Sequence, residues 1–406
     1  MEIWGRKKEA CFFLPKHHIR SFYMKHIIII TAERYPNGGA GAVRLHYIAK
    51  ALLEAGCQVS VLCRGHAGET GCFDNVPYYS LRGKCTFWGA RVLDYFLFSA
   101  RVKQWLKSSQ KDIDCIYAYG VPVSLLRFLK KWNRHEIQLL YDCVEWYSPQ
   151  EFKLKRFDWR YQANNYINSK LIDGSFSVIA ISCYLKEYYS KKNIAVLRVP
   201  VLCECTSRKK QKAGENSLTL FYAGVPGKKD YIGNILEASL LLKPEEQKKI
   251  KIVFVGIRRS ALEKQLGISP KILTACTEFL ELYDRVPREE VLKKMKSADF
   301  VVLPRDASLR YAQAGFPSKV VESLANATPI LCNYSSDLEL YLTDGENALI
   351  ADDHTPEALA TTLRRALCLT AAEKERMSEN ALKAAERFFD YRLYVEPLQK
   401  FINGDG

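Results

Sequence analysis

Two glycine-rich segments carry residue types and spacing that suit a phosphate ligand. In residues 38–41 (GGAG), Gly39 comes directly before a helical pattern, so free backbone amides would lie at a helix N-terminus, where an anion is stabilised. In residues 224–230 (GVPGKKD), Gly224 allows a close approach of the backbone, and Lys228 and Lys229 add compact positive charges. The sequence therefore predicts phosphate binding at both loops. The alternative is that the glycines only permit tight turns and the lysines are solvated.

A third segment, residues 314–322 (AGFPSKVVE), has the residues of a helix start. Pro317 and Ser318 are favoured at the beginning of a helix, whose free amides would again face a ligand. Lys319 adds a positive charge there, and Glu322 adds a carboxylate one turn later. The alternative is a plain ion pair between Lys319 and Glu322 within the helix.

Carboxylates and aromatic rings gather in residues 141–147 (YDCVEWY), at the end of a predicted strand. Aromatic rings stack on apolar faces of ligands, and Asp142 or Glu145 would orient or deprotonate a substrate hydroxyl. Capping of the following segment by these carboxylates is the alternative. Asp112 and Asp114 form a DxD string, but it stands before a strand rather than after one, which favours a solvated turn over a metal site.

The elements that must position these residues alternate along the chain. From Met24 onward, short β-branched runs alternate with helical periods, which is typical of βαβ units and parallel sheets. Ligands bind at the carboxyl ends of such strands, where the segments above lie. The predicted strands are residues 27–31, 59–63, 113–117, 138–141, 177–181, 218–222, 250–255, 278–282, 300–303 and 329–333.

The domain organisation follows from where this alternation breaks. A polar, aperiodic stretch interrupts it and is the predicted linker. We therefore expect an α/β protein of two doubly wound, Rossmann-like domains that face a cleft. The expected parts are a leader at 1–23, a first domain at 24–203, the linker at 204–217, a second domain at 218–385 and a C-terminal helix at 386–406 that returns to the first domain. The leader is expected to be disordered or to precede a true start at Met24; the alternative is an arm that touches a membrane.

The 406 residues carry a formal net charge of +15, which is unevenly placed. Residues 1–200 hold 30 Lys and Arg against 16 Asp and Glu, whereas residues 201–406 hold 30 against 29. A basic half indicates a polyanionic partner, and because nucleic-acid-binding motifs are absent we expect an anionic membrane surface and no nucleic acid. The stretch 86–107, apolar nearly all round, would either fill a core or insert Phe98 or Trp105 into lipid.

The sequence also excludes several classes of protein. It has neither the GxGxxG nor the Walker pattern, which argues against a dinucleotide oxidoreductase and against an ATPase. Its 13 cysteines include no CxxC pair, and several lie in apolar strand-like runs, so they are expected to be reduced thiols. We therefore expect a cytoplasmic protein, peripheral on the inner face of the cell membrane.

Several of these segments together resemble a known family. Residues 314–333 (AGFPSKVVESLANATPILCN), the GVPGKKD loop and the glycine-rich first loop are similar to GT-B glycosyltransferases of the retaining family four, in particular members from bacterial capsular, exopolysaccharide or O-antigen clusters. The similarity covers roughly residues 24–401. It implies the GT-B fold and a nucleotide-diphosphate sugar donor, UDP- or GDP-linked, on the second domain. It also implies a glycan or lipid-pyrophosphate-linked acceptor, retention at the anomeric carbon, and neither a cofactor nor an obligatory metal.

The resemblance also implies roles for individual residues. Glu322 matches the second carboxylate of a paired-glutamate motif, which binds the ribose. Lys228 and Lys229, with Arg305 and Arg310, would neutralise the diphosphate, which itself would take the acceptor proton as it leaves.

This sequence departs from the family pattern at three positions. Ala314 stands where the first glutamate is usual, Val225 where an arginine is usual, and Tyr119 where many members have a histidine. The absent first glutamate and the missing histidine support a second hypothesis, a catalytically silent GT-B subunit that binds a partner transferase or a polymer.

Overall fold

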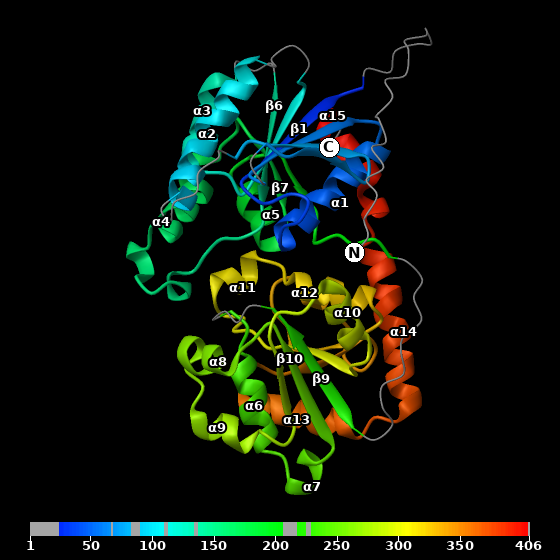
Figure 1. Cartoon of the computed structure of the whole chain (residues 1–406). Helices are drawn as coiled ribbons and strands as arrows, with labels where there is room; N and C mark the ends of the chain where they lie inside the picture. Colours follow the sequence, from blue (N-terminus) through cyan, green and yellow to red (C-terminus); the bar gives the residue numbers. More distant parts are fainter. Residues whose placement is uncertain are drawn as a thin grey trace, which may run out of the picture.

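The computed structural model describes residues 24–65, 68–82, 90–108, 113–133, 137–205, 217–224 and 229–404. The expected leader, most of the expected linker and Lys228 lie outside these residues. The chain forms two α/β units, one above the other in Figure 1, each built on its own sheet.

The N-terminal sheet has the strand order β3-β4-β2-β1-β5-β6-β7-β8, and its pairs are parallel except for the antiparallel pair β3 and β4. Side chains along β1 alternate between the two faces, and all of them are buried from Ile27 to Ile30. Both faces are therefore covered, as parallel sheets require. The strands are β1 His26–Thr31, β2 Gln58–Cys63, β3 Thr70–Phe73, β4 Val76–Ser80, β5 Cys115–Tyr119, β6 Gln138–Cys143, β7 Ser177–Ala180 and β8 Val196–Arg198.

Helices cover the two faces of this sheet separately (Figure 1). Ile28 and Ile30 pack with helices on one face, whereas Ile27 and Ile29 pack with α1 and the C-terminal helix α15 on the other. The helices of this unit are α1 Ala40–Glu54, α2 Ala90–Ser108, α3 Val123–Trp132, α4 Trp159–Tyr166, the π-helix η4 Ile167–Leu171 and α5 Cys183–Ser190, with 3-10 turns η2 Pro149–Glu151 and η3 Lys155–Phe157.

The C-terminal sheet has the strand order β11-β10-β9-β12-β13-β14 and is parallel throughout. Its strands are β9 Leu218–Ala223, β10 Ile250–Val255, β11 Leu280–Tyr283, β12 Phe300–Leu303, β13 Ile330–Asn333 and β14 Ala348–Ala351. Its helices are α6 Ile232–Leu240, α7 Pro244–Gln247, α8 Arg259–Leu266, α9 Pro270–Ala275, α10 Arg288–Lys296, α11 Arg310–Ala314, α12 Ser318–Ala325 and α13 Pro356–Leu367, with the 3-10 turn η5 Leu338–Leu340.

The chain then crosses back to the first unit. Helix α14 Ala371–Phe388 runs along one side of the molecule, and a short turn η6 Tyr391–Tyr394 leads into α15 Val395–Asn403 (Figure 1). Leu398, Phe401 and Ile402 of α15 are buried against the N-terminal sheet. The aromatic-rich end of the chain thus fills the outer face of the first unit.

The sequence prediction of two doubly wound α/β units is confirmed, and every predicted strand is present with its boundaries shifted by two residues at most. The insertion of Phe98 into lipid is wrong, because this side chain of α2 is fully buried in the hydrophobic core, and Trp105 is half-buried. Asp114 accepts a hydrogen bond from the His26 backbone amide, whereas Asp112 lies outside the described residues. None of the helices in the described residues is long and apolar enough to span a bilayer.

Candidate functional site

In both sheets the order in which the chain adds strands reverses, and the loops at this reversal lie at the edge where the two units face each other. In the first sheet the chain turns one way after β1 and the other way after β5, and in the second it does so after β9 and β12. Loops after such strand pairs are the usual ligand sites of open α/β sheets. They meet here in a cavity of about 410 Å³ lined by residues 33, 40, 41, 44, 119, 120, 141, 142, 144, 145, 147, 164, 181, 201, 229, 305, 311 and 315–319.

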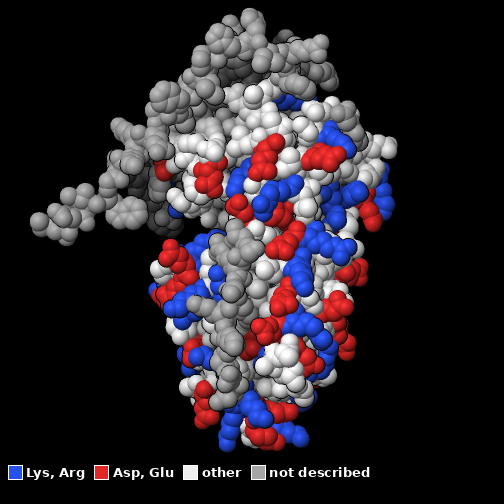
Figure 2. All heavy atoms as spheres, turned by 90° about the vertical axis from the view of Figure 1, so that its right-hand side faces the viewer, with Lys and Arg blue, Asp and Glu red and all other residues white. Residues whose placement is uncertain are grey.

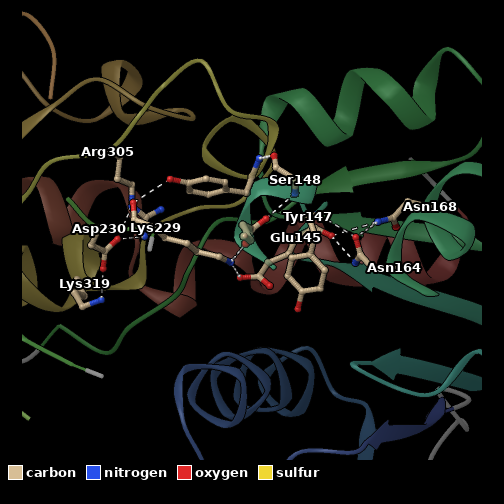
Figure 3. A network of polar contacts seen from close by, with 11 residues as sticks. Glu145, Tyr147, Ser148, Asn164, Asn168, Lys229, Asp230, Arg305 and Lys319 are labelled. Carbon is tan, nitrogen blue, oxygen red and sulfur yellow. Dashed lines mark hydrogen bonds and ion pairs between the residues drawn. The ribbon is translucent and has the colours of Figure 1, made fainter. Parts of the chain in front are cut away.

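A buried carboxylate, Asp230, organises the C-terminal wall of this cavity. It ends the GVPGKKD loop after β9 and binds Arg305 at 2.9 Å and Lys319 at 2.8 Å (Figure 3). The Tyr222 hydroxyl also donates to it, at 2.9 Å. Burial alone would raise the pKa of Asp230, but the attraction of Arg305 and Lys319 outweighs it and lowers the pKa below the ordinary value. Two cations share one carboxylate, so this wall keeps a positive excess for an anion.

Gly224 explains how Lys319 reaches this network. It has a φ of +145°, and a Cβ there would lie 3.1 Å from Cε of Lys319. Lys319 sits in the first turn of α12, beside Pro317 and Ser318, which also line the cavity. The alternative of an ion pair between Lys319 and Glu322 is wrong, because Lys319 pairs with Asp230 and Glu322 pairs with Arg288. The helix start, the Lys319 amine and the Arg305 guanidinium therefore converge on one side of the cavity.

Lys229 reaches across the cavity to the N-terminal wall. Its amine lies 2.9 Å from Glu145 and 3.0 Å from Glu151, and Figure 3 shows it extended between the two units. Burial opposes its charge, but the two carboxylates outweigh this effect and raise the pKa of Lys229. An incoming diphosphate would therefore have to compete with Glu145 and Glu151 for this amine.

Further contacts join the two walls beside the cavity. Arg310 donates to the Tyr147 carbonyl oxygen, the Tyr311 amide donates to Ser148 Oγ at 3.1 Å, and the Ser182 hydroxyl donates to the Ala314 carbonyl oxygen at 2.7 Å. Arg310 thus supports the junction between the units and stacks on the Trp146 ring, 4.6 Å from its centre. It does not line the cavity in this structure, in contrast to Arg305.

Asp142 and Glu145, expected together from the sequence, lie in different environments. Asp142 is fully buried and forms a two-pronged ion pair with Arg44, with both contacts at 2.9 Å. Arg44 also donates to the carbonyl oxygens of Val199 and Pro200. Both carboxylate oxygens of Asp142 thus accept from Arg44, as the structural alternative predicts, whereas Glu145 stays partly exposed at the cavity.

Glu33 is a cavity residue that the sequence analysis missed. It follows β1, and burial raises its pKa, with a further upward effect from Glu145 and an opposing one from Arg64. Tyr119, in the position expected for a histidine, lies close to α1, because a Cβ on Gly41 would be 2.6 Å from its hydroxyl. The signal that would have identified Glu33 is its place directly after the first strand.

A second cavity of about 410 Å³ adjoins the first and shares Glu33 and Gly120 with it. Gly39, the residue that precedes α1, lines this cavity and not the main one. Arg34 and Arg64 add two guanidinium groups at its wall. Cationic side chains thus lie on the N-terminal unit's side of the cavities as well.

Glu322 lies outside the main cavity. It projects from α12 toward α10, where its carboxylate is 3.3 Å from Arg288, and 36% of its side chain is exposed. A ligand that extends from Lys319 along α12 would meet it one turn away. A ribose-binding role for Glu322 stays a prediction.

The comparisons with known proteins agree with this layout. Residues 38–202 match the family model described as Glycosyltransferase Family 4, and residues 205–384 match the one described as Glycosyl transferases group 1. A comparison with curated proteins finds no matching sequence.

Solved structures share the whole fold at low sequence identity. Sucrose-phosphate synthase from Thermosynechococcus elongatus is 13% identical with a TM-score of 0.72, over 94% of this chain and 98% of that one. WaaG, a glycosyltransferase involved in lipopolysaccharide biosynthesis, is 15% identical with a TM-score of 0.66, over 93% and 100%. HepE from Anabaena, solved in complex with UDP-glucose, is 15% identical with a TM-score of 0.65, over 94% and 100%. With both halves matched by the two family models, the chain belongs to the group 1 glycosyltransferases and has the GT-B fold.

Proposed function

We propose that this protein transfers a sugar from a nucleotide-diphosphate sugar to a glycan or lipid-linked acceptor, with retention at the anomeric carbon. One observation carries the donor site: Arg305, Lys319 and the start of α12 converge on one wall of the cavity, with Asp230 as their shared anion. A diphosphate matches this wall in charge and in hydrogen-bonding capacity. The binding of UDP and UDP-glucose by HepE supports a donor of this kind.

Residues on the two walls of the cavity would have different roles. Arg305 and Lys319 would hold the diphosphate, and Lys229, with Lys228, would stabilise the charge that grows on it as the glycosidic bond breaks. The departing diphosphate would accept the proton of the acceptor hydroxyl. Glu145 would orient that hydroxyl once Lys229 has turned to the donor. That no metal is required stays a prediction.

The acceptor is proposed to carry a phosphate or pyrophosphate. Arg34 and Arg64 line the second cavity, which adjoins the main cavity at Glu33. An acceptor on a lipid pyrophosphate would place its anionic group against these guanidinium groups. Such an acceptor suits synthesis of a surface polysaccharide and a peripheral position on the inner face of the cell membrane.

A panel of UDP- and GDP-linked sugars tests this function through thermal stabilisation and slow donor hydrolysis. A ligand at 100 times its dissociation constant raises the free energy of unfolding by about 2.7 kcal/mol. Lys228→Ala with Lys229→Ala should lower turnover more than donor affinity. If a distant pair, Lys293→Ala with Lys294→Ala, lowers turnover equally, the phosphate role of Lys228 and Lys229 is wrong.

A second candidate is a catalytically silent subunit. The pairing of the charged Lys229 amine with Glu145 and Glu151 favours it, together with Ala314 in place of the first glutamate. In that case the protein would bind a partner transferase or a polymer. Nucleotide binding without any donor hydrolysis, or no nucleotide binding at all, would support this candidate over the enzyme.

A further inference from the structure

Residues 149–163 include the 3-10 turns η2 and η3 and the start of α4. They leave the N-terminal unit after β6 as a loop whose base is fixed at the cavity. The Tyr147 amide donates to Oδ1 of Asn164 at 3.0 Å, and Nδ2 of Asn164 donates to the Glu145 carbonyl oxygen at 3.1 Å (Figure 3). Tyr147 and Asn164 both line the main cavity. The two ends of the loop are therefore part of the cavity wall.

The inner side of this loop is well packed. The Phe152 ring lies edge-on to Tyr147, with ring centres 5.3 Å apart, and the Arg160 guanidinium lies 4.8 Å above it. Asp158 caps α4 by accepting from the Arg160 amide and also binds the Arg160 side chain. These contacts give the loop a defined shape, so the exposure of its outer side chains does not come from a lack of structure.

The outer side of the loop is apolar and basic. Leu154, Phe157 and Trp159 are 64%, 84% and 60% exposed. In the part of the chain that the structure describes, they are three of the four large hydrophobic side chains that are more than half exposed, and the fourth is Met24. Lys153, Lys155 and Arg156 alternate with them and are also exposed. Clustered exposure of this kind marks an interaction surface.

We propose that this surface, formed by Lys153, Leu154, Lys155, Arg156, Phe157 and Trp159, docks on an anionic lipid bilayer. Tryptophan and phenylalanine favour the depth of the lipid headgroups, and lysine and arginine are attracted by anionic headgroups around them. From Phe152 to Phe157 the loop has no acidic residue, and the next one, Asp158, is buried against Arg160. Apolar and basic side chains that alternate in this way match a bilayer interface.

The position of the surface distinguishes it from the rest of the molecule. The loop lies beside α4 on the left of Figure 1, opposite α14. On the α14 side, Figure 2 shows Lys and Arg interspersed with Asp and Glu. Docking through the loop would therefore turn one side of the molecule toward the membrane and leave the mixed-charge side in solution.

The biological use of this docking rests on the proposed function. Because the base of the loop is part of the cavity wall, a docked loop would hold the cavity beside the bilayer, within reach of a lipid-carried acceptor. The physical binding does not depend on the enzyme activity. The two proposals can therefore fail separately.

The test is sedimentation of the full-length protein with vesicles of one part phosphatidylglycerol to two parts phosphatidylcholine, and with pure phosphatidylcholine. We expect binding to the anionic vesicles at about 50 mM salt that weakens at about 500 mM, where the charges are screened. Phe157→Ser with Trp159→Ser should weaken partitioning at least about tenfold. The matched control, Leu241→Ser with Leu393→Ser, removes two hydrophobic side chains that are 47% and 48% exposed and should bind like the wild type.

Charge and depth can be tested separately. Lys153→Glu, Lys155→Glu and Arg156→Glu together should abolish binding, whereas Lys248→Glu, Lys249→Glu and Lys271→Glu on the second unit should not. Lipids brominated near the headgroup should quench the fluorescence of Trp159, and Trp159→Phe should remove this quenching.

If the wild type stays in the supernatant with anionic vesicles at low salt, or if the serine and control variants bind equally, the proposal is overturned, and the surface then fits a protein partner. UDP affinity, measured without vesicles on the same loop variants, should remain unchanged. Failure of nucleotide binding in the wild type would overturn the proposed function and leave the docking result standing.

Discussion

The two walls of the cavity each contain a buried pair of arginine and aspartate, and the two pairs differ in how much positive charge remains unpaired. Arg44 and Asp142 satisfy each other, with 3% and 0% of their side chains exposed. Asp230 is shared by Arg305 and Lys319, with 26% of the Lys319 side chain exposed. We call the first a closed pair, because its two charges balance, and the second an open pair, because one positive charge remains for a ligand. The arginine–aspartate pairs of the two units thus differ because Asp142 has one cationic partner and Asp230 has two.

The largest effect should come from breaking the closed pair. Arg44→Ala would leave the Asp142 carboxylate buried and unpaired, which should lower the free energy of unfolding by about 3–5 kcal/mol. Urea denaturation measures this change. Lys191→Ala serves as the control, because its pair with Glu187 is 78% and 70% exposed and should contribute at most about 0.5 kcal/mol. A loss below about 1 kcal/mol for Arg44→Ala would mean that the pair is not a structural support.

Removing a cation from the open pair should lower the affinity for the nucleotide. Lys319→Ala removes one of two cations from the C-terminal wall and should weaken UDP binding by about 1.5–3 kcal/mol, the contribution of a charge-assisted hydrogen bond. Isothermal titration calorimetry on the folded variant measures it. The control is Lys251→Ala, whose amine pairs with Glu281 at 2.7 Å and does not line the cavity. Equal affinities for the two variants would remove Lys319 from the donor site.

A variant of Glu322 tests whether the donor extends along α12 from this wall. If its carboxylate accepts the ribose hydroxyls, Glu322→Ala should reduce donor affinity more than tenfold, or at least about 1.4 kcal/mol. Arg288→Ala removes the ion-pair partner of Glu322 and should leave the affinity near that of the wild type. A reversed result, with the loss in Arg288→Ala alone, would show that the carboxylate serves only the ion pair.

The smallest effect should be a difference in pH dependence between the walls. Burial raises the pKa of Glu33 above the ordinary 4.5, so its contribution to stability is present below about pH 4.5 and is lost as the pH rises through the folded-state value. Asp230 has the opposite sign, because its pKa is lowered and its contribution is lost only as the pH falls below the ordinary 3.8. Glu33→Gln should therefore unfold like the wild type at pH 4 and at a higher temperature at pH 8. A difference between the two proteins that does not change with pH would contradict this assignment.

Sequence reasoning identified the sheets because periodicity is local, and it missed what depends on distant partners. The alternating runs predicted β10 and β12 with their observed bounds. They did not predict β3 and β4, an antiparallel hairpin whose turn has positive φ at Asp74 and Asn75, nor the four-residue strand β14.

The candidate site shows the same limit. Lys229 and Lys319 were expected to face a phosphate, but their carboxylate partners come from other loops, Glu145 and Asp230, at separations of 84 and 89 residues. Asp230 adjoins the predicted lysines in the GVPGKKD loop and was not singled out, because only the fold brings Arg305 to it. Asp142 and Glu145 look equivalent in sequence, and only the buried Arg44 separates their roles.

The most direct test of the central claim is calorimetric titration of UDP and GDP into the wild-type protein and into Arg305→Ala. We expect one of the two nucleotides to bind the wild type with a dissociation constant that rises at least about tenfold in a folded Arg305→Ala variant, because the buried guanidinium is the most fixed cation of the donor wall. Absence of binding by both nucleotides, or equal binding by the wild type and the variant, would contradict the assignment of this cavity as the donor site.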